Sequence, residues 1–102
     1  MPSMIVLVNL KESVSLEAYE RWVLESYAPE VRELPSVEDW RAYRATDLLG
    51  SGAAPPYRYV VTLEIEDLDR LGCDIASEEV QRLFSELHEL AEITQIIPDR
   101  FA

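Results

Sequence analysis

His88 is the only histidine in the chain, and its side chain has the ordinary pKa that lies nearest to neutral pH. It stands one helical turn after Phe84 and four residues before Glu92, beside a predicted buried helix face. A histidine at that edge can act as a general acid or base, with the Glu92 carboxylate orienting its ring. The alternative is a partly exposed boundary histidine that packs its ring on apolar neighbours. The residue pattern leaves both interpretations open.

Aromatic residues form the second candidate group. Aromatic rings at helical or strand spacing pack a core more often than they line a ligand site, but every buried hydroxyl needs a hydrogen-bond partner. So many hydroxyl groups in a small core favour a cavity in which substrate or water supplies those partners. We expect Tyr19 or Tyr59 to donate to a developing oxyanion, and Trp40 to stack on an aromatic ring. The rings expected to line this cavity are Tyr19, Trp22, Tyr27, Trp40, Tyr57 and Tyr59.

Two polar residues, Arg44 and Asn9, are expected beside these rings. The Arg44 guanidinium either stacks on Tyr59 or holds a carbonyl or carboxylate of a ligand. Asn9, near the end of the first predicted strand, either orients a substrate carbonyl or only ends the strand. No metal site is expected, because His88 has no second soft ligand near it in the sequence.

A predicted β-hairpin positions most of these side chains. Its strands, residues 37–46 and 57–66, flank a long loop that contains Gly50, Gly52 and two prolines. Pairing Thr46 with Tyr57 sets the register, and alternate side chains then share a face. One face carries Trp40, Ala42, Arg44, Tyr57, Tyr59, Val61, Leu63 and Ile65. The opposite face carries Asp39, Arg41, Tyr43, Val60, Thr62 and Glu64.

The remaining elements complete a β-α-β-β-α-β order. An apolar strand over residues 4–10 precedes a helix that Ser15 caps and that runs from residue 16 to about 27. Pro29 is expected to disturb this helix, with a further turn or two over residues 30–34. Residues 67–76 are expected to be irregular or briefly helical. Ser77 caps a second helix that ends at residue 90, and the last strand covers residues 92–97.

This order is typical of the ferredoxin-like α+β fold, in which two helices cover one face of a four-stranded antiparallel sheet. The first strand is apolar on both faces, so a second layer must cover the face that the helices leave open. The obvious candidate is the same face of another copy. We therefore expect a homodimer formed sheet to sheet.

Composition limits the class of function. A chain of 102 residues indicates a single domain over residues 1–102, and 20 acidic against 9 basic side chains give a net charge of −11. That charge disfavours nucleic acids and anionic membranes as partners and suits a neutral or cationic small molecule. The sequence shows no signal peptide and no apolar run that could span a membrane, so a cytoplasmic location is expected. Cys73, the only cysteine, is expected to be inert beside Asp74.

Two stretches resemble a known superfamily. The segments AYERW at residues 18–22 and APEVRELPSV at residues 28–37 resemble the dimeric α+β barrel proteins, many of which run through P-x-V-x-x-L-P-(G/S)-V into the second strand. Within that superfamily, DLLGS at residues 47–51 with APPYRY at residues 54–59 resembles the RedY-like (HapK) proteins of bacterial prodiginine and bisindole biosynthesis. The similarity covers residues 4–97. Some superfamily members have a histidine just before the proline, whereas Tyr27-Ala28 stands here, so their dehalogenating, quinone-forming or haem-degrading chemistry is not transferred.

The resemblance implies a cofactor-independent enzyme of natural-product biosynthesis. Its reaction would be the cyclisation, condensation or dehydration of an indole- or pyrrole-derived intermediate, and His88 would move the proton. One alternative is a non-catalytic module that binds or chaperones such an intermediate. Another is a cofactor-free monooxygenase of the same fold, which would consume dioxygen. A haem-binding variant of the fold would need His88 as an axial ligand.

Overall fold

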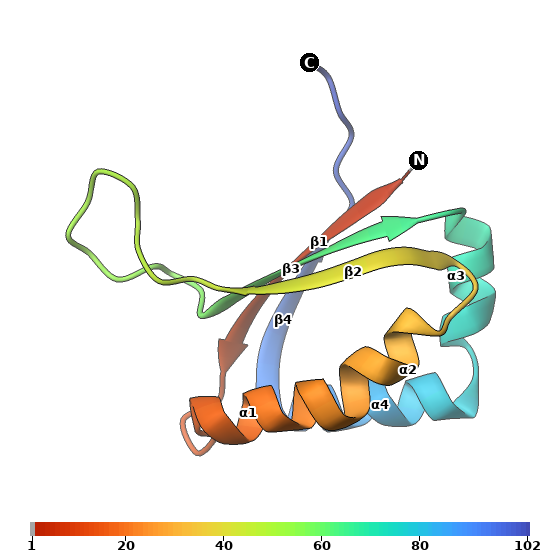
Figure 1. The fold of residues 1–102 in the computed structure, drawn as a ribbon, viewed down its shortest axis with the longest axis horizontal. Helices are drawn as coiled ribbons and strands as arrows, with labels where there is room; N and C mark the ends of the chain where they lie inside the picture. Colours follow the sequence, from red (N-terminus) through yellow and green to blue (C-terminus); the bar gives the residue numbers. More distant parts are fainter. Residues whose placement is uncertain (1) are drawn as a thin grey trace.

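The computed structural model describes residues 2–102 as one four-stranded antiparallel sheet with all helices on one side of it (Figure 1). The strand order is β2-β3-β1-β4, which confirms the ferredoxin-like α+β fold. The elements are β1 (Ser3–Leu10), α1 (Leu16–Trp22), η1 (Val23–Tyr27), α2 (Ala28–Arg32), β2 (Val37–Arg44), β3 (Tyr59–Ile65), α3 (Leu68–Ile75), α4 (Glu78–Leu90) and β4 (Ala91–Ile96).

The hairpin has the predicted register but shorter strands. Arg44 pairs with Tyr59, and Trp40 pairs with Leu63, so the alternation of faces is as expected. The ladder ends sooner than predicted: β2 stops at Arg44 and β3 begins at Tyr59. One more backbone bond, from the Ala45 N–H to the Arg58 carbonyl at 2.9 Å, closes the pairing. Tyr57 therefore lies outside the sheet, because it belongs to the proline-containing loop that precedes β3.

The first helix runs further than predicted, because a π-helical turn carries it through Pro29. Ser15 caps α1 by accepting the Ala18 N–H at 3.1 Å, as its position predicts. Within η1 the backbone widens, and the Ala28 N–H donates to the Val23 carbonyl, five residues back. Pro29 then sits in the first turn of α2, where a missing N–H is tolerated. Tyr27 is the last residue of the widened turn.

The other helices agree with the expected pattern. Ser77 caps α4 by accepting the Val80 N–H at 3.3 Å, and α3 supplies the short helix expected before it. The longest helix has 13 residues. Across residues 2–102, no helix combines the length and the apolar character that crossing a membrane requires.

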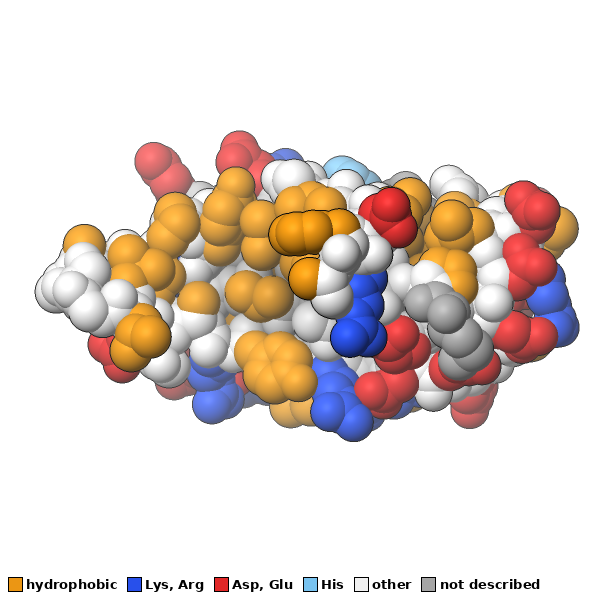
Figure 2. Space-filling model, turned by 90° about the horizontal axis from the view of Figure 1, so that it is seen from above, with side chains coloured by type: hydrophobic (Ala, Val, Ile, Leu, Met, Phe, Trp, Pro, Cys, Tyr) orange, Lys and Arg blue, Asp and Glu red, His pale blue; other side chains and the backbone are white. Residues whose placement is uncertain are grey.

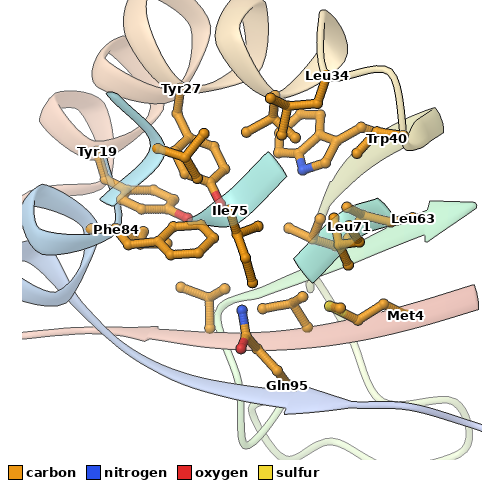
Figure 3. A pocket seen from close by; sticks show the side chains of 17 residues that line it. Met4, Tyr19, Tyr27, Leu34, Trp40, Leu63, Leu71, Ile75, Phe84 and Gln95 are labelled. Atoms are coloured by element: carbon orange, nitrogen blue, oxygen red, sulfur yellow. The ribbon is translucent and has the colours of Figure 1, made fainter. Parts of the chain in front are cut away.

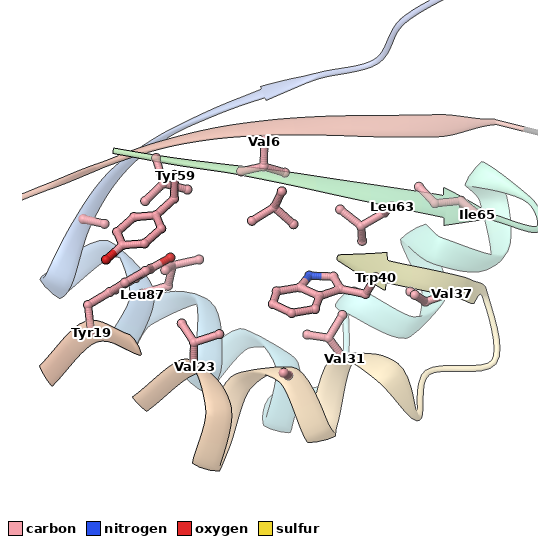
Figure 4. Packing of buried hydrophobic residues seen from close by; sticks show 14 of the residues in the cluster. Val6, Tyr19, Val23, Val31, Val37, Trp40, Tyr59, Leu63, Ile65 and Leu87 are labelled. Atoms are coloured by element: carbon pink, nitrogen blue, oxygen red, sulfur yellow. The ribbon is translucent and has the colours of Figure 1, made fainter. Parts of the chain in front are cut away.

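The core lies between the sheet and the helices (Figure 4). Ile65 on β3 is fully buried, and Val8 on β1 is 2% exposed. In Figure 4, Trp40 and Leu63 extend from the sheet toward Val23 and Val31 on the helices. Burial of these side chains supplies the main driving force for folding.

The opposite face of the sheet carries no helix (Figure 1). Register places alternate residues of all four strands there, and Figure 2 shows hydrophobic side chains gathered over it. Tyr43 is 49% exposed and Ile96 is 40% exposed, although both belong to strands. We call this surface the open sheet face; its apolar members are Ile5, Leu7, Tyr43, Val60 and Ile96.

Replacing Ile65 with alanine tests the position of the core. The substitution should lower the free energy of unfolding by about 2–5 kcal/mol, because it leaves a cavity at a fully buried site. Ile97→Ala is the matched control: this side chain is 61% exposed, so its loss should change stability by less than about 0.5 kcal/mol. Urea unfolding followed by circular dichroism measures both. Equal effects of the two substitutions would contradict this core.

Candidate functional site

A cavity lies within the core, between the helices and the sheet (Figure 3). Its volume is about 90 Å³, enough for several water molecules or for the buried end of an organic ligand. Most of its wall is aliphatic and comes from β1, β3, α3 and α4. We call this space the inner cavity. Its aromatic and polar wall residues are Tyr19, Tyr27, Trp40, Phe84 and Gln95.

Several hydrogen-bonding groups face the inner cavity without a protein partner. In Figure 3 the Tyr19 and Tyr27 hydroxyls and the Trp40 indole nitrogen point into it, with the Gln95 amide opposite. Tyr19 and Trp40 are each only 5% exposed. Of the side-chain hydrogen bonds formed within residues 2–102, none involves these two hydroxyls, this indole N–H or this amide. Across residues 2–102, only the Ser36 hydroxyl is a fully buried side-chain polar atom without a partner, so the groups at the cavity are accessible from it. A ligand or water in the cavity can therefore supply their hydrogen bonds.

Burial keeps both tyrosine hydroxyls protonated. It raises the pKa of Tyr19 to about 12. The pKa of Tyr27 is also raised, first by burial and then by the neighbouring Tyr19. Both groups are therefore neutral hydrogen-bond donors across the physiological pH range.

An open groove lies beside the inner cavity. It has a volume of about 440 Å³ and lies between α1–η1 and the hairpin. Tyr19, Trp40 and Val61 line both spaces, so the two are adjoining. Ala42 stands on the helix-facing side of β2 between the larger Trp40 and Arg44, and it remains exposed. Its small side chain leaves the groove unfilled. We call this space the outer groove.

The Glu20 carboxylate ties α1 to the hairpin at the outer groove. It accepts the Tyr59 hydroxyl at 2.8 Å and the Arg44 Nε–H at 2.9 Å. These bonds, the one from Arg44 above all, lower the pKa of Glu20 to about 2. Burial together with the bond to Glu20 raises the pKa of Tyr59. The Tyr59 ring also packs on Tyr19, with 4.9 Å between the ring centres.

Glu20 is a site residue that the sequence analysis missed. Its signal was present: a cation predicted to face the helices needs an anion, and Glu20 is next to Tyr19 on the buried helix stripe. The Arg44 guanidinium forms an ion pair with Glu20. This contact is neither the stacking on Tyr59 nor the bond to a ligand that the sequence suggested.

Five of the predicted site residues meet at the two spaces. Tyr19, Tyr27 and Trp40 line the inner cavity, while Arg44 and Tyr59 line the outer groove. The common surface predicted for Trp40, Arg44 and Tyr59 is thus observed, and the space in front of it is unfilled. The role of each residue in binding or catalysis stays a prediction.

His88 and Trp22 lie elsewhere. His88 is exposed on α4 and lines neither space, and its Nδ1 is 2.6 Å from the Phe84 carbonyl oxygen. The expected position at the rim of the cavity is therefore corrected, since the helix turns this ring to solvent. Trp22 also lines neither space: its indole N–H donates to Glu86 on α4 at 3.1 Å, which joins α1 to α4.

Tyr57 and Asn9 are also separated from the predicted cavity. Tyr57 lines a distinct hollow within the loop that connects β2 and β3. The Asn9 amide bonds to the end of that loop, donating to the Pro56 carbonyl at 2.8 Å and accepting the Arg58 N–H at 3.0 Å. Asn9 therefore anchors the loop to β1, because both ends of its amide bond to backbone.

Stability should depend on pH through Glu20. Its pKa falls from 4.5 to about 2 on folding, so its stabilising effect is complete above pH 4.5 and is lost as the pH falls toward 2. The difference in the free energy of unfolding between wild type and Glu20→Gln should thus be larger at pH 6.5 than at pH 3. Glu12→Gln, which removes an exposed charge outside this network, corrects for net charge. Urea titrations at both pH values measure the effect, and an equal difference at the two would contradict the network.

Comparison with known proteins identifies relatives of this fold and chain. The structure matches that of HapK from Hahella chejuensis with a TM-score of 0.80 and 24% identity, covering 99% of this chain and 93% of that one. A protein from Arabidopsis thaliana matches with a TM-score of 0.80 and 14% identity, covering 100% and 97% of the two chains. SnoaB, a cofactor-independent oxygenase from Streptomyces nogalater, matches with a TM-score of 0.75 and 13% identity, covering 99% and 93%.

Curated proteins gave no match. The sequence does match the family model described as REDY-like protein HapK, over residues 2–100. That match spans nearly the whole chain, including every element that builds the inner cavity and the outer groove. The chain therefore belongs to the REDY-like HapK family.

Proposed function

We propose that this protein binds a flat aromatic biosynthetic intermediate, derived from indole or pyrrole, in the outer groove and the inner cavity. It promotes the cyclisation, condensation or dehydration of that intermediate without a cofactor. The observation that carries the proposal is that two tyrosine hydroxyls without protein partners face an apolar cavity with an open groove beside it. Ligand sites are typically apolar spaces of this size with a few convergent polar groups. Membership of the HapK family supports the biosynthetic setting.

Catalysis in this site would depend on orientation and on hydrogen-bond donation. A ligand held in one reactive geometry gains several kcal/mol of rate acceleration from orientation alone. Tyr19 and Tyr27 would donate to oxygen as negative charge develops on it, and the apolar wall would strengthen those bonds. The Tyr59 hydroxyl is already bound to Glu20, so its role would be to hold the groove in shape. Trp40 would present its ring edge and its N–H to the ligand.

Proton removal is the part of the chemistry that the site supports least. His88 lies outside both spaces, and the pKa of Glu20, about 2, makes its carboxylate a weak base near neutral pH. This observation favours a second candidate function, in which the protein shelters and presents a reactive intermediate without transforming it. Under the leading proposal, the substrate's own basic atoms or water would accept the proton.

The active form would be a homodimer that pairs two open sheet faces. The apolar strand side chains on that face are partly or largely exposed in one copy, and a twofold arrangement would cover both copies at once. One structural relative, from Thermobifida fusca, is described as a dimeric ferredoxin-like protein. The helices and the two ligand spaces lie on the other side of the sheet, so pairing would leave them free.

A charge on the open sheet face should separate the dimer. Ile5→Glu would bury a carboxylate without a partner at the interface, and it should shift the mass in solution toward that of one chain, 11.7 kDa. Leu16→Glu, at the start of α1 on the helix side, is the control and should remain dimeric. Light scattering after size-exclusion chromatography measures both masses. A wild-type protein of single-chain mass, or an unchanged Ile5→Glu dimer, would contradict the arrangement.

Turnover tests the proposed function directly. The protein should accelerate product formation from a bipyrrole aldehyde with a pyrrole, as followed by chromatography and mass spectrometry. Tyr27→Phe should lower that rate by about 10²-fold, because it removes one donor to the oxyanion. The same variant should change the free energy of unfolding by less than about 1 kcal/mol, because the Tyr27 hydroxyl has no hydrogen bond to protein to lose. Tyr57→Phe and His88→Ala, outside both spaces, should leave the rate unchanged.

Other outcomes separate the candidates. Saturable binding without product would establish the sheltering function instead. Consumption of dioxygen would indicate the monooxygenase chemistry. Failure of every such compound to bind would end the proposal.

A further inference from the structure

The inner cavity is rich in neutral hydrogen-bond donors and carries no charged side chain among its described wall residues. We infer that it selects the uncharged carbonyl end of a ligand and rejects carboxylates and ammonium groups, so that the substrate enters carbonyl first and leaves its aromatic ring in the outer groove. This inference rests on the proposed function and adds the chemical class and the direction of entry of the ligand.

The donors converge on one space from separate elements. Tyr19 comes from α1, Tyr27 from η1 and Trp40 from β2, and Figure 3 shows all three polar atoms turned to the cavity. Packing fixes each ring: Tyr19 lies 4.9 Å from Tyr59, and Tyr27 lies 6.1 Å from Trp40, between ring centres. The donors are thus held in place before a ligand arrives. A carbonyl oxygen has two lone pairs and can accept from two of them at once.

The protonation states of the donors and of the ligand decide which ligand groups can bind in the cavity. Tyr19 and Tyr27 are neutral at pH 7, as tyrosines ordinarily are, and burial raises both pKa values further. A carboxylate entering this space would lose its hydration and meet no cation, and burial of an unpaired charge is strongly unfavourable. A ketone or aldehyde loses much less on leaving water and regains its hydrogen bonds inside.

The nearby arginines do not alter this selection. Arg44 lines the outer groove, and its charge is already balanced by Glu20. Arg32 is exposed and stands over the Trp40 ring, 5.2 Å from the ring centre, without lining the cavity. An ammonium group would find a carboxylate at Glu20 in the outer groove, but the inner cavity offers it mainly donors. The net charge of −11 further disfavours approach of an anion.

Three indoles of similar shape test the selection on the full-length protein. Indole-3-carbaldehyde carries a neutral acceptor, 3-methylindole carries none, and indole-3-carboxylate carries a charge at pH 7. Calorimetry should show the aldehyde binding about 10-fold more tightly than 3-methylindole, as expected for one net hydrogen bond. The carboxylate should bind at least about 100-fold more weakly than the aldehyde.

The two tryptophans provide a readout inside the site. In nitrogen–proton correlation spectra, the aldehyde should move the indole N–H signal of Trp40 downfield, because this group gains an acceptor. The signal of Trp22 should stay in place, since its N–H already donates to Glu86 outside both spaces. Trp22→Phe assigns the two signals and serves as the control variant.

Tyr27→Phe keeps the shape of the cavity and removes one donor. It should weaken binding of the aldehyde several-fold and leave binding of 3-methylindole unchanged. Equal affinity for the aldehyde and 3-methylindole, tight binding of the carboxylate, or an unmoved Trp40 signal would overturn the inference while the proposed aromatic site stands. If none of the three indoles binds, the proposed function fails and the inference falls with it.

Discussion

The hydroxyls of Tyr19 and Tyr27, which face an apolar cavity and bond to no described protein group, are the constraint on which this structure depends. Each hydroxyl needs water or a ligand in the cavity as its partner, because an unsatisfied hydroxyl in an apolar setting costs about 1–3 kcal/mol and a small domain has little stability to spare. Phenylalanine would fill the same volume at both positions without that penalty. Two tyrosines that face one cavity without partners are therefore better explained by what the cavity holds than by how the core packs. The remaining architecture keeps that cavity open and reachable.

Two devices maintain the opening. Glu20 links α1 to the hairpin through Arg44 and Tyr59, which fixes the distance between helix and sheet beside the exposed Ala42. The π-helical turn η1 carries the chain past Pro29 and ends at Tyr27, so this ring is placed by a local departure from α-helical geometry. Such turns often occur at functional sites.

The fold was largely predictable, and the site was predictable in part. Strand alternation around Trp40 and Tyr59 set the hairpin register, and Ser15 and Ser77 marked the helix starts. The predicted position of His88 was wrong. A side chain beside the buried stripe of a helix can face either the core or solvent, and only packing decides which. Glu20 was missed because its partners, Arg44 and Tyr59, are far from it in sequence. The positions of Tyr57 and Asn9 depend on where the loop leaves the sheet. The alternation of apolar and polar residues along the strands does not define that point.

A crystal of the protein soaked with indole-3-carbaldehyde would test the central claim most directly. We predict electron density for the aldehyde oxygen within about 3 Å of the Tyr19 or Tyr27 hydroxyl, a normal hydrogen-bond distance, with the indole ring lying in the outer groove. Density for the ligand only on the open sheet face, or a core in which side chains fill the inner cavity and the two hydroxyls bond to protein, would contradict the account.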